Sequence, residues 1–417
     1  MERLTDEVRK ERIRKYARLV AHTGLRVEPG EEVWIEAGLD QPEFVGMVVE
    51  ECYKLKAKSV TVRWNYPPIA KMAYKYQTVA TLGKVKSFEK ERLKYAVKHL
   101  PTRLYIESDD PDALKGVNQL KMAKASQKAY RVIKPFRDKM EDKYKWCIIG
   151  VPGKEWAEKV FPDLKGEEAI NALWDAILYT VRVDENDPVE NWEKHNAFLH
   201  EKQKQLIDLD LRKLIYHASN GTDFEVELIP HSLWGCGSEA LKDGRVYNPN
   251  MPTEEVFTSP FAGKCEGKLV ASKPLSYNGE IIDDFYVVFK NGKVSEVHAK
   301  KNQKLLETMV KMDECSCMLG EVALVPFESP INQTNMLFYN TLYDENACCH
   351  VALGAGFIMT LAEAHERDLS VEEAKELGIN DSIIHVDFMI GTRDLDIVGI
   401  TAKGERIQIF KNGTWAF

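Results

Sequence analysis

The stretches Glu31-Glu-Val-Trp-Ile-Glu-Ala37 and Ser59-Val-Thr-Val-Arg-Trp64, with a helical pattern over residues 42–56 between them, decide the fold class of the first half. Both are rich in the β-branched and aromatic residues that favour strands. Apolar stretches at 102–107 and 146–151 are likewise preceded by helical patterns. Short strands that alternate with helices predict an α/β domain with a mostly parallel sheet, which we assign to residues 1–190.

The pattern changes after the polar, proline-containing segment 182–191, which we interpret as a domain boundary. Short β-rich segments with glycine-containing turns follow it. Asn291-Gly292 and Asn412-Gly413 each lie between extended runs, and Asn-Gly pairs in that setting are strong signals for hairpins. We therefore predict that residues 191–417 form an α+β, β-rich domain that carries the catalytic site.

Composition excludes several classes of function. The 417 residues include 57 Lys and Arg against 65 Asp and Glu, a formal charge of −8, which is the opposite of a nucleic-acid-binding surface. No apolar run approaches the roughly 20 residues needed to cross a bilayer, and the first residues lack a signal-peptide pattern. We expect a cytoplasmic protein with no nucleic-acid or membrane partner. Its eight sparse cysteines are then expected to be thiols.

Familiar catalytic and nucleotide-binding motifs are missing from the sequence. It contains no G-x-x-x-x-G-K-[ST], no G-x-G-x-x-G between a strand and a helix, no H-E-x-x-H and no G-x-S-x-G. What remains is a set of carboxylates and histidines in apolar surroundings, all in the second half.

The clearest of these is Asp381-Ser-Ile-Ile-His-Val-Asp-Phe-Met-Ile390, an apolar strand-like run that contains His385 and Asp387. Their i, i+2 spacing puts both side chains on one face of a strand. Two polar groups on such a face are costly to bury unless they are paired or bind a ligand. Two interpretations stay open at this point, a structural His-Asp hydrogen bond and metal ligation.

Other acidic residues and one more histidine have similar surroundings. Glu321 lies among strand formers, Glu345 and His350 precede a small apolar run, and Glu255 follows Glu254 between two prolines. Taken singly, each has an ordinary structural interpretation. Taken together, four carboxylates and two imidazoles suit two divalent cations, Zn²⁺, Co²⁺ or Mn²⁺, that share bridging carboxylates. The six candidates are Glu255, Glu321, Glu345, His350, His385 and Asp387.

At these residues the chain resembles the thermophilic metalloaminopeptidases of the aminopeptidase T, AmpS and PepS type. The matching stretches are Asn250-Met-Pro-Thr-Glu-Glu-Val-Phe-Thr-Ser-Pro260, Gly320-Glu-Val-Ala-Leu-Val-Pro326, Asn340-Thr-Leu-Tyr-Asp-Glu-Asn-Ala347 with His350, and Ser382-Ile-Ile-His-Val-Asp-Phe-Met-Ile-Gly391. The resemblance implies two domains, a dinuclear metal site held by the six candidates, and usually a homodimer. It also implies an enzyme that removes N-terminal residues from peptides that have a free N-terminus.

One position departs from the family pattern. The family usually has a tyrosine seven residues after the ligand histidine, thought to assist catalysis, and this chain has Phe357 there. The hydroxyl group is lost, so a hydrogen bond from this side chain to the transition state is impossible. Tyr343, where the family more often has phenylalanine, is a candidate substitute.

We therefore expect a metal-dependent aminopeptidase in which a water activated at the dinuclear site attacks the first peptide bond. Glu321 is our candidate for orienting or deprotonating that water, with Glu254 as the alternative base. Two rival functions stay open. His350, His385 and Asp387 also match the 2-His-1-carboxylate pattern of non-haem Fe(II) ring-cleaving dioxygenases, and a metal-stabilised peptide-binding module without turnover is the other.

Overall fold

The structure is a computed structural model that describes residues 3–140 and 142–417. Contacts divide the chain into two compact units. The first runs to Lys194 and includes Ser238–Pro252, and the second consists of His195–Gly237 and Thr253–Phe417. The predicted fold class is confirmed, since a parallel α/β region precedes a β-rich region. We did not predict that a short later segment returns to the first unit.

Helices and strands alternate in the first unit. Its elements are α1 (Asp6–Leu19), the π-helical turn η1 (Val20–Gly24), β1 (Glu32–Gly38), α2 (Pro42–Lys54), β2 (Ser59–Asn65), α3 (Pro67–Tyr76), α4 (Val79–Leu82), α5 (Ser87–His99), β3 (Thr102–Glu107), α6 (Gln119–Asp138), β4 (Trp146–Gly150), α7 (Lys154–Val160), α8 (Glu167–Thr180), and, in the returning segment, β8 (Glu239–Ala240), β9 (Val246–Tyr247) and β10 (Asn250–Met251). Before the returning segment, the helix α9 (Pro188–Leu209) follows α8 in the chain and leads from the first unit into the second.

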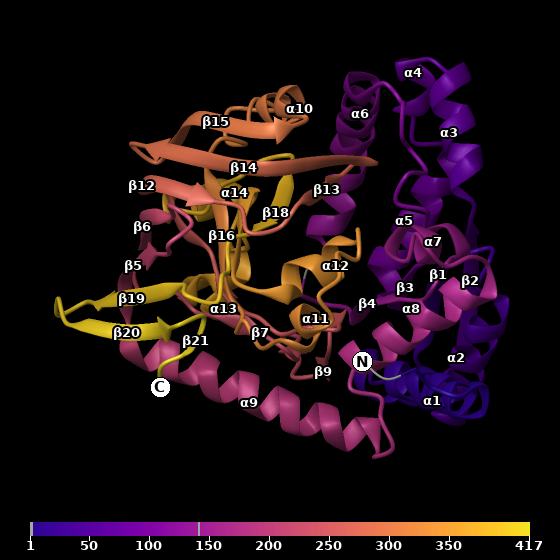
Figure 1. Cartoon of the computed structure of the whole chain (residues 1–417). Helices are drawn as coiled ribbons and strands as arrows, with labels where there is room; N and C mark the ends of the chain where they lie inside the picture. The colour runs from indigo at the N-terminus through magenta and orange to yellow at the C-terminus, as the bar shows by residue number, and fades with distance from the viewer. Residues whose placement is uncertain (1–2, 141) are drawn as a thin grey trace. The chain divides into compact units, whose positions relative to one another are not determined.

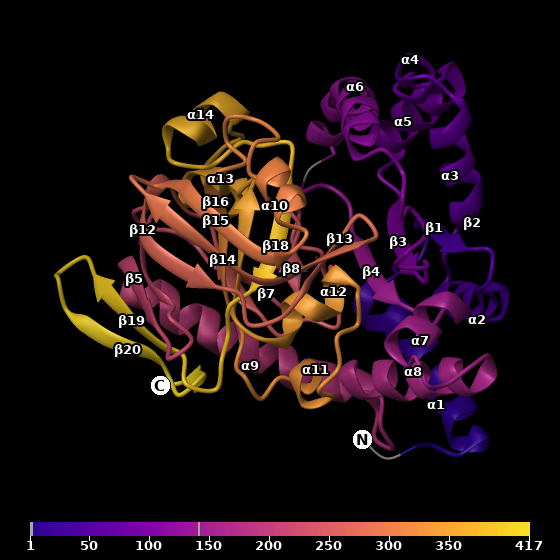
Figure 2. The ribbon, with the colours of Figure 1, turned by 45° about the horizontal axis from the view of Figure 1, so that its top comes forward.

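The sheet of the first unit has the strand order β10-β4-β3-β1-β2, and its pairings are all parallel. Helices α1, α2 and α8 lie side by side in Figures 1 and 2. Tyr16, Phe44 and Trp174, one from each of these helices, pack together with ring centroids 5.4–6.5 Å apart. These aromatic rings belong to the buried core of the unit, as do the strand residues Val33 and Ile35.

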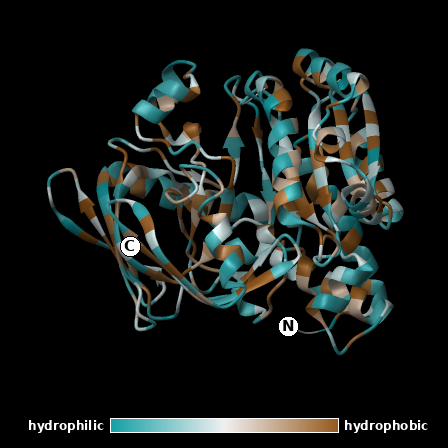
Figure 3. Cartoon of the chain, turned by 90° about the horizontal axis from the view of Figure 1, so that it is seen from above, coloured by the Kyte–Doolittle hydropathy of each residue, from teal (hydrophilic) through white to brown (hydrophobic). Residues whose placement is uncertain are grey.

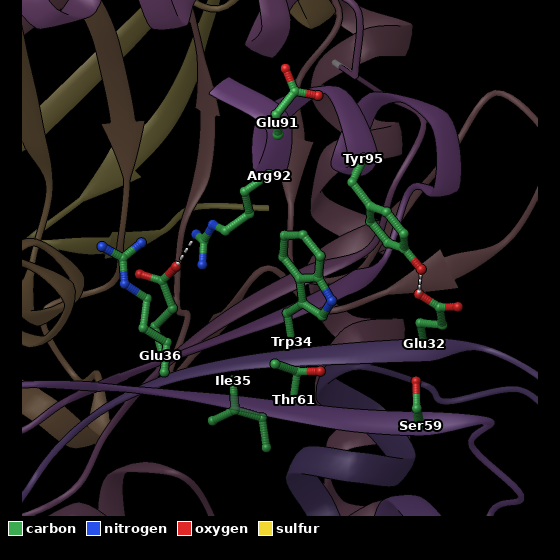
Figure 4. Close-up of a pocket in the computed structure, with 10 residues that line it drawn as sticks. Glu32, Trp34, Ile35, Glu36, Ser59, Thr61, Glu91, Arg92 and Tyr95 are labelled. Atoms are coloured by element: carbon green, nitrogen blue, oxygen red, sulfur yellow. Dashed lines mark hydrogen bonds and ion pairs between the residues drawn. The ribbon is translucent and has the colours of Figure 1, made fainter. Parts of the chain in front are cut away.

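The side chains that alternate with Val33 and Ile35 face α5 on the other side of β1. Together with residues of β2 and α5 they line a hollow of about 500 Å³ (Figure 4). Arg92 of α5 donates to Glu36 at 2.8 Å, and the Tyr95 hydroxyl donates to Glu32 at 2.8 Å. Trp34 stands between these two pairs in Figure 4, and its ring stacks with that of Tyr95. These charged groups of the hollow therefore satisfy one another.

The second unit is dominated by strands. Its elements after α9 are β5 (Leu211–His217), β6 (Asp223–Leu228), β7 (Gly235–Cys236), β11 (Val256–Thr258), β12 (Pro260–Val270), β13 (Leu275–Tyr277), β14 (Glu280–Lys290), β15 (Lys293–Lys301), α10 (Gln303–Met309), β16 (Leu319–Leu324), α11 (Pro330–Gln333), α12 (Thr341–Asp344), the 3₁₀ turn η2 (Glu345–Ala347), β17 (His350–Gly354), the 3₁₀ turn η3 (Ile358–Thr360), α13 (Ala362–Glu366), α14 (Val371–Glu376), β18 (His385–Met389), β19 (Asp396–Thr401), β20 (Arg406–Lys411) and β21 (Thr414–Trp415).

These strands form two antiparallel sheets. The larger has the order β13-β14-β12-β6-β5-β19-β20-β21, with β15 paired to β14, and the smaller has the order β18-β17-β16-β11-β7. Figure 1 shows β12, β14 and β15 side by side and the β19–β20 hairpin in yellow. One apolar core contains buried residues from both sheets, such as Phe285 of β14 and Phe388 of β18, whose ring centroids are 5.6 Å apart. One face of the smaller sheet is therefore committed to this core.

Both predicted hairpin turns are confirmed. Asn291-Gly292 joins β14 to β15, and Asn412-Gly413 joins β20 to β21. All four residues have positive φ, 51° at each asparagine and 75° at each glycine, which a two-residue hairpin turn requires. Helix α9 begins at Pro188, so it includes the last residues of the segment 182–191 that we interpreted as a domain boundary.

Hydrophobic and hydrophilic residues alternate along the helices, as Figure 3 shows, which is the pattern of helices that cover a core with one face. Within the residues that the structure describes, no helix combines the length and the apolar character needed to span a membrane.

A buried ion pair ties the chain's beginning to α8. Nε of Arg9 donates to Oδ1 of Asp175 at 2.7 Å and Nη2 donates to Oδ2 at 3.1 Å, and both side chains are almost inaccessible. Removal of Asp175 leaves the buried Arg9 guanidinium with the exposed Asp6 as its only ion-pair partner among the described residues. We expect Asp175→Ala to lower the free energy of unfolding of the first unit by about 3–5 kcal/mol.

Urea unfolding followed by tryptophan fluorescence checks this prediction, because Trp174 is adjacent. The control is Glu50→Ala, which removes an exposed ion pair with Lys54 and should cost less than about 1 kcal/mol. An Asp175→Ala protein as stable as this control would contradict the assigned role.

Candidate metal centre

The smaller sheet of the second unit carries most of the candidate ligands. Glu321 lies in β16, His350 begins β17, and His385 and Asp387 lie in β18. Glu255 directly precedes β11. Glu345 is the exception, since it begins the 3₁₀ turn η2 between α12 and β17.

Strand alternation explains why these side chains meet. In the sheet register, Glu321 of β16 is opposite Ala352 of β17, and Ala352 is opposite Asp387 of β18, so the three share one face. His350 and His385 lie two residues from Ala352 and Asp387 and share that face too. The intervening residues, among them Val322, Val351, Val386 and Phe388, belong to the apolar core. One face of the sheet therefore builds the core and the other builds the site.

Small side chains leave room on the site face. Ala323 and Ala352 lie on it between the polar residues, and Gly354 of β17 is opposite His385. A Cβ atom at Gly354 would lie 2.0 Å from the carbonyl oxygen of Ile384, and φ there is +108°. Glycine is therefore required for β17 and β18 to approach closely beside the imidazole.

The donor atoms form two groups that share one carboxylate. Atoms of Glu255, Glu321 and His350 lie within 4.8 Å of one another, and so do atoms of Glu321, His385 and Asp387. Nε2 of His350 lies 3.1 Å from Oε2 of Glu255, and Nε2 of His385 lies 3.0 Å from Oε2 of Glu321. Glu321 therefore stands at the centre of the arrangement.

Glu345 completes the set at a longer range. It belongs to neither close group, but its carboxylate is near enough to interact electrostatically with the other carboxylates. Burial raises the pKa of Glu345 well above its usual range, and the charges of Asp387, Glu255 and Glu321 raise it further. The structure thus places five of the six predicted residues in two groups of close donor atoms that share Glu321, and it places the sixth near enough to interact with them electrostatically.

The electrostatics of the cluster call for added positive charge. Burial, together with the charges of Asp387 and Glu255, raises the pKa of Glu321 to about 7. Burial opposes protonation of His350, but the hydrogen bond to Glu255 and nearby carboxylate charges outweigh it and raise the pKa to about 9. In the absence of a cation, Glu321 and His350 therefore hold protons more tightly than usual, and these protons offset part of the negative charge of the buried carboxylates.

Backbone carbonyl groups orient both imidazoles toward the cluster. Nδ1 of His385 lies 2.7 Å from the Ala355 carbonyl oxygen, and Nδ1 of His350 lies 3.3 Å from that of Cys348. A carbonyl oxygen only accepts, so each Nδ1 carries the hydrogen and each Nε2 presents a lone pair when the ring is neutral. Both lone pairs then point at carboxylate oxygens, which is unfavourable unless a proton or a metal ion lies between them.

The residues present fit divalent cations. Oδ1 of Asp387 is buried without a hydrogen bond and lies 3.3 Å from Nε2 of His385. The donors are carboxylate oxygens and imidazole nitrogens, a mixture that suits Zn²⁺, Co²⁺ and Mn²⁺. Hydrogen bonds from backbone carbonyl groups to ligand histidines are also a common support of metal sites.

Sequence reasoning missed Asn346, which connects three parts of the site. Its Oδ1 accepts from the Glu254 backbone N–H at 2.7 Å, and its Nδ2 donates to the Leu342 carbonyl at 3.0 Å and to Oε1 of Glu345 at 3.4 Å. The side chain is fully buried. The only available signal was its place directly after Glu345, because nothing local reveals a partner 92 residues away.

Asp344 and His195 also support the site, and sequence reasoning did not find them. The Asp344 carboxylate accepts from the backbone N–H groups of Phe338 at 2.7 Å and Asn340 at 3.1 Å, which holds the loop before Glu345. Nε2 of His195 lies 2.7 Å from the Thr253 carbonyl oxygen and 3.9 Å from the Glu254 carboxylate. Glu254 itself is buried beside Glu255.

Phe357 lies against the site face. Its ring centroid is 5.0 Å from that of His385 and 5.2 Å from that of Phe257, and its backbone N–H donates to the Ser259 hydroxyl at 2.8 Å. Tyr343, the candidate substitute for a catalytic tyrosine, is completely buried and stacks on Phe338. Phe357 therefore contacts a candidate ligand through its ring, whereas Tyr343 packs into the protein interior.

Known proteins similar to this chain share its full length. The family model for thermophilic metalloprotease (M29) matches residues 9–415. Aminopeptidase AmpS of Bacillus subtilis is 38% identical over 98% of this chain and 99% of its own. Aminopeptidase T of Thermus aquaticus is 36% identical over 97% of this chain and 98% of its own.

A solved structure supports the same relationship. Wild-type AmpT from Thermus thermophilus matches with a TM-score of 0.88 and 34% sequence identity, covering 98% of this chain and all of that one. The resemblance inferred from the four sequence stretches is thus confirmed, and the protein is an enzyme of the peptide-hydrolase class. The chain belongs to the thermophilic metalloprotease (M29) family.

Proposed function

We propose that the protein is an aminopeptidase that uses two divalent cations, Zn²⁺, Co²⁺ or Mn²⁺, to hydrolyse the N-terminal residue from peptides. One observation carries the dinuclear part of this proposal. The candidate donors form two groups, and Glu321 is a member of both. A carboxylate shared in this way is the usual bridge between two metal ions.

The same observation argues against the dioxygenase alternative. A mononuclear iron site of that kind needs His350, His385 and Asp387 around one ion. Among the described residues, neither group of close donors contains both imidazoles, because His350 lies with Glu255 and His385 lies with Asp387. Two ions, each bound by one imidazole, would use every donor of both groups. A single iron ion bound by the two imidazoles and Asp387 would leave Glu255 and Glu321 unused.

Charge balance supports both the cations and the substrate class. Glu255, Glu321, Glu345 and Asp387 supply four negative charges when ionised, which two divalent cations would neutralise. A peptide with a free N-terminus brings an ammonium group that suits the remaining carboxylate, Glu254, next to Glu255. Relatives 36–38% identical over almost the whole chain are named aminopeptidases, which agrees with this choice.

The proposed ligands are Glu255, Glu321, Glu345, His350, His385 and Asp387. Bound divalent cations would supply Lewis acidity and lower the pKa of a water toward about 7. The chain's own groups would do the rest. Glu321 would orient the water and accept its proton, and the backbone carbonyl groups at Ala355 and Cys348 would keep both imidazoles aimed at the site.

Glu254 is the alternative proton acceptor, because it is buried beside Glu255 and lies outside both donor groups. Its backbone is anchored by Asn346, so its position is defined. Loss of turnover with full metal content in Glu254→Gln would move the role of base from Glu321 to Glu254.

The homodimer expected from the resemblance and the cytoplasmic location expected from the composition stay predictions. Sedimentation velocity of the full chain tests the homodimer.

Replacing Glu321 tests the shared ligand. We expect Glu321→Gln to lower kcat for a leucyl anilide by at least about 10³-fold and to lower the bound metal content, because one amide cannot bridge two cations. Metal analysis of the same samples accompanies the assay. The control is Glu372→Gln, an exposed residue of α14, which should match the wild type. Metal-dependent turnover of Glu321→Gln at the control rate would contradict the assignment.

Metal removal should destabilise the protein more strongly as pH rises. The pKa of Glu321 is raised from 4.5 to about 7, so burial of this side chain favours the protonated form. In the metal-free protein this burial therefore costs no folding stability below about pH 4.5, where the carboxyl group is protonated, and costs most above pH 7, where it is ionised. The raised pKa of His350 means that its pairing with Glu255 stabilises below pH 6.5 and is lost as pH passes 9. Both effects lower metal-free stability from pH 6 to pH 9.

We therefore expect the difference in Tm between metal-loaded and chelated protein to widen by several degrees from pH 6 to pH 9. Differential scanning fluorimetry at constant ionic strength measures it, and about 1 kcal/mol corresponds to roughly 2–4 °C in a domain of this size. A difference that stays constant or narrows over this range would show that the cations do not replace protons in the cluster.

Phe357 offers a gain-of-function test. A tyrosine at this position would place a hydroxyl group beside the His385 ring, where the family usually has one. We expect Phe357→Tyr to raise kcat by about tenfold with little change in KM, since one well-placed donor to a developing oxyanion is worth about 10²–10³ in kcat. The matched control is Phe257→Tyr, on the neighbouring ring. Equal effects of the two variants would show that position 357 has no special role.

A further inference from the structure

A second hollow, of about 610 Å³, opens in the first unit at the carboxyl ends of β1, β2 and β3. None of its lining residues belongs to the metal centre, since all lie between Gly38 and Glu155. Its volume falls within the roughly 300–1,000 Å³ of small-molecule sites. The hollow is therefore large enough for a ligand and shares no residue with the proposed catalytic machinery.

Its place in the sheet is the one where ligands bind to parallel sheets. The order β4-β3-β1-β2 puts β1 between its two partners. The connection after β1 leads to β2 on one side of the neighbouring strands β1 and β3, and the connection after β3 leads to β4 on the other side. The two loops diverge between the ends of β1 and β3, which leaves a crevice at this topological switch point. Leu39 and Asp40 follow β1 there, and Ser108 and Asp109 follow β3.

A fixed carboxylate occupies that crevice. Oδ1 of Asp40 accepts from the Ser108 hydroxyl at 2.9 Å, and Oδ2 accepts from the Gln41 amide at 3.0 Å. A Cβ atom at Gly38 would lie 2.4 Å from Oδ1 of Asp40, and one at Gly153 would lie 3.0 Å from Oδ2. Two glycines thus make room for this carboxylate, and two donors hold it while it stays exposed to solvent.

A second carboxylate strengthens the negative charge on this side. Asp109 lines the same hollow, and burial together with the charges of Asp40 and Asp110 raises its pKa. It accepts no hydrogen bond from the described residues. A cation placed here would relieve the repulsion among the three carboxylates.

The opposite charge comes from α3. Lys71 and Lys75 line the hollow one helical turn apart, and neither forms an ion pair with a carboxylate of the described chain. Tyr66 and Met72 line it too and leave about half of their surfaces exposed, 53% and 51%. The hollow therefore combines carboxylates from the sheet edge, ammonium groups from a helix and uncovered apolar side chains.

This combination points away from a metal ion. The carboxylates of this hollow are absent from the groups of donors that approach within 4.8 Å of one another among the described residues. The hollow in Figure 4 differs in another way, because Glu36 is already paired with Arg92 and Glu32 with Lys58 and Tyr95. The hollow at the switch point, in contrast, presents both signs of charge, and among the described residues no ion pair joins its carboxylates to Lys71 or Lys75.

We propose that the switch-point hollow binds a free amino acid or short peptide in its zwitterionic form. The α-ammonium group would pair with Asp40 and Asp109, the carboxylate with Lys71 and Lys75, and the side chain would cover Tyr66 and Met72. The products of peptide hydrolysis have this chemistry, but the proposal does not depend on turnover at the metal centre.

Isothermal titration of the full chain, kept metal-free with a chelator, separates this site from hydrolysis. The probes are L-leucine and Leu-Leu, with N-acetyl-leucine lacking the ammonium group and leucinamide lacking the carboxylate. We expect one equivalent of leucine or Leu-Leu to bind, and each modified probe to bind at least tenfold more weakly. No binding by either zwitterion at 10 mM, or equal binding of the modified probes, would overturn the proposal.

Variants locate the binding. Asp40→Asn and Lys71→Glu should each weaken leucine binding at least tenfold, and Lys71 lies on a helix without buried residues, so its replacement leaves folding intact. The matched control Lys84→Glu, an exposed lysine of the same unit outside the hollow, should bind as the wild type does. Glu345→Gln should also bind normally. Binding lost in Glu345→Gln but kept in Lys71→Glu would assign the zwitterion to the metal centre instead and refute the second site.

Discussion

Buried negative charge is the constraint on which the second unit depends. Glu255, Glu321 and Asp387 are each less than one-tenth exposed. Glu321 and Asp387 share one face of a five-stranded sheet with two imidazoles, and Glu255 lies beside one of these imidazoles, directly before a strand of the sheet. Carboxylates in such surroundings stay charged only when a cation or a set of hydrogen-bond donors compensates them. Protonation of Glu321 and His350 is the compensation available to the protein alone, and divalent cations are the compensation that the donor geometry suits.

The architecture follows from keeping that face apart from the apolar core. Valine and phenylalanine side chains alternate with the polar ones along β16, β17 and β18, so the same strands build the core and the site. Ala323, Ala352 and Gly354 keep the polar face open. The rigid register of the sheet then fixes His350, His385 and Asp387 relative to Glu321, and Asn346 connects the Glu254 segment to the loop that carries Glu345.

The alternation of side chains between the two faces of a strand made part of the site and the fold predictable from the sequence. The spacing of His385 and Asp387 in an apolar run indicates a shared strand face, and the Asn-Gly pairs indicate the hairpin turns that the structure contains. Glu255 had no such signal, because it precedes a strand of only three residues. Its place beside His350 depends on pairing between β11 and β16, more than 60 residues apart in sequence. The same limit hid Asn346, His195 and the return of β10 to the first sheet.

The account rests on two cations that share Glu321, and X-ray diffraction from crystals of the metal-loaded enzyme tests this most directly. Data collected at the absorption edge of the bound metal locate each ion. The account predicts two anomalous peaks about 3.5–4 Å apart, one beside His350 and Glu255 and the other beside His385 and Asp387, with Glu321 between them. A single peak coordinated by both imidazoles, or no peak within this cluster, would contradict it.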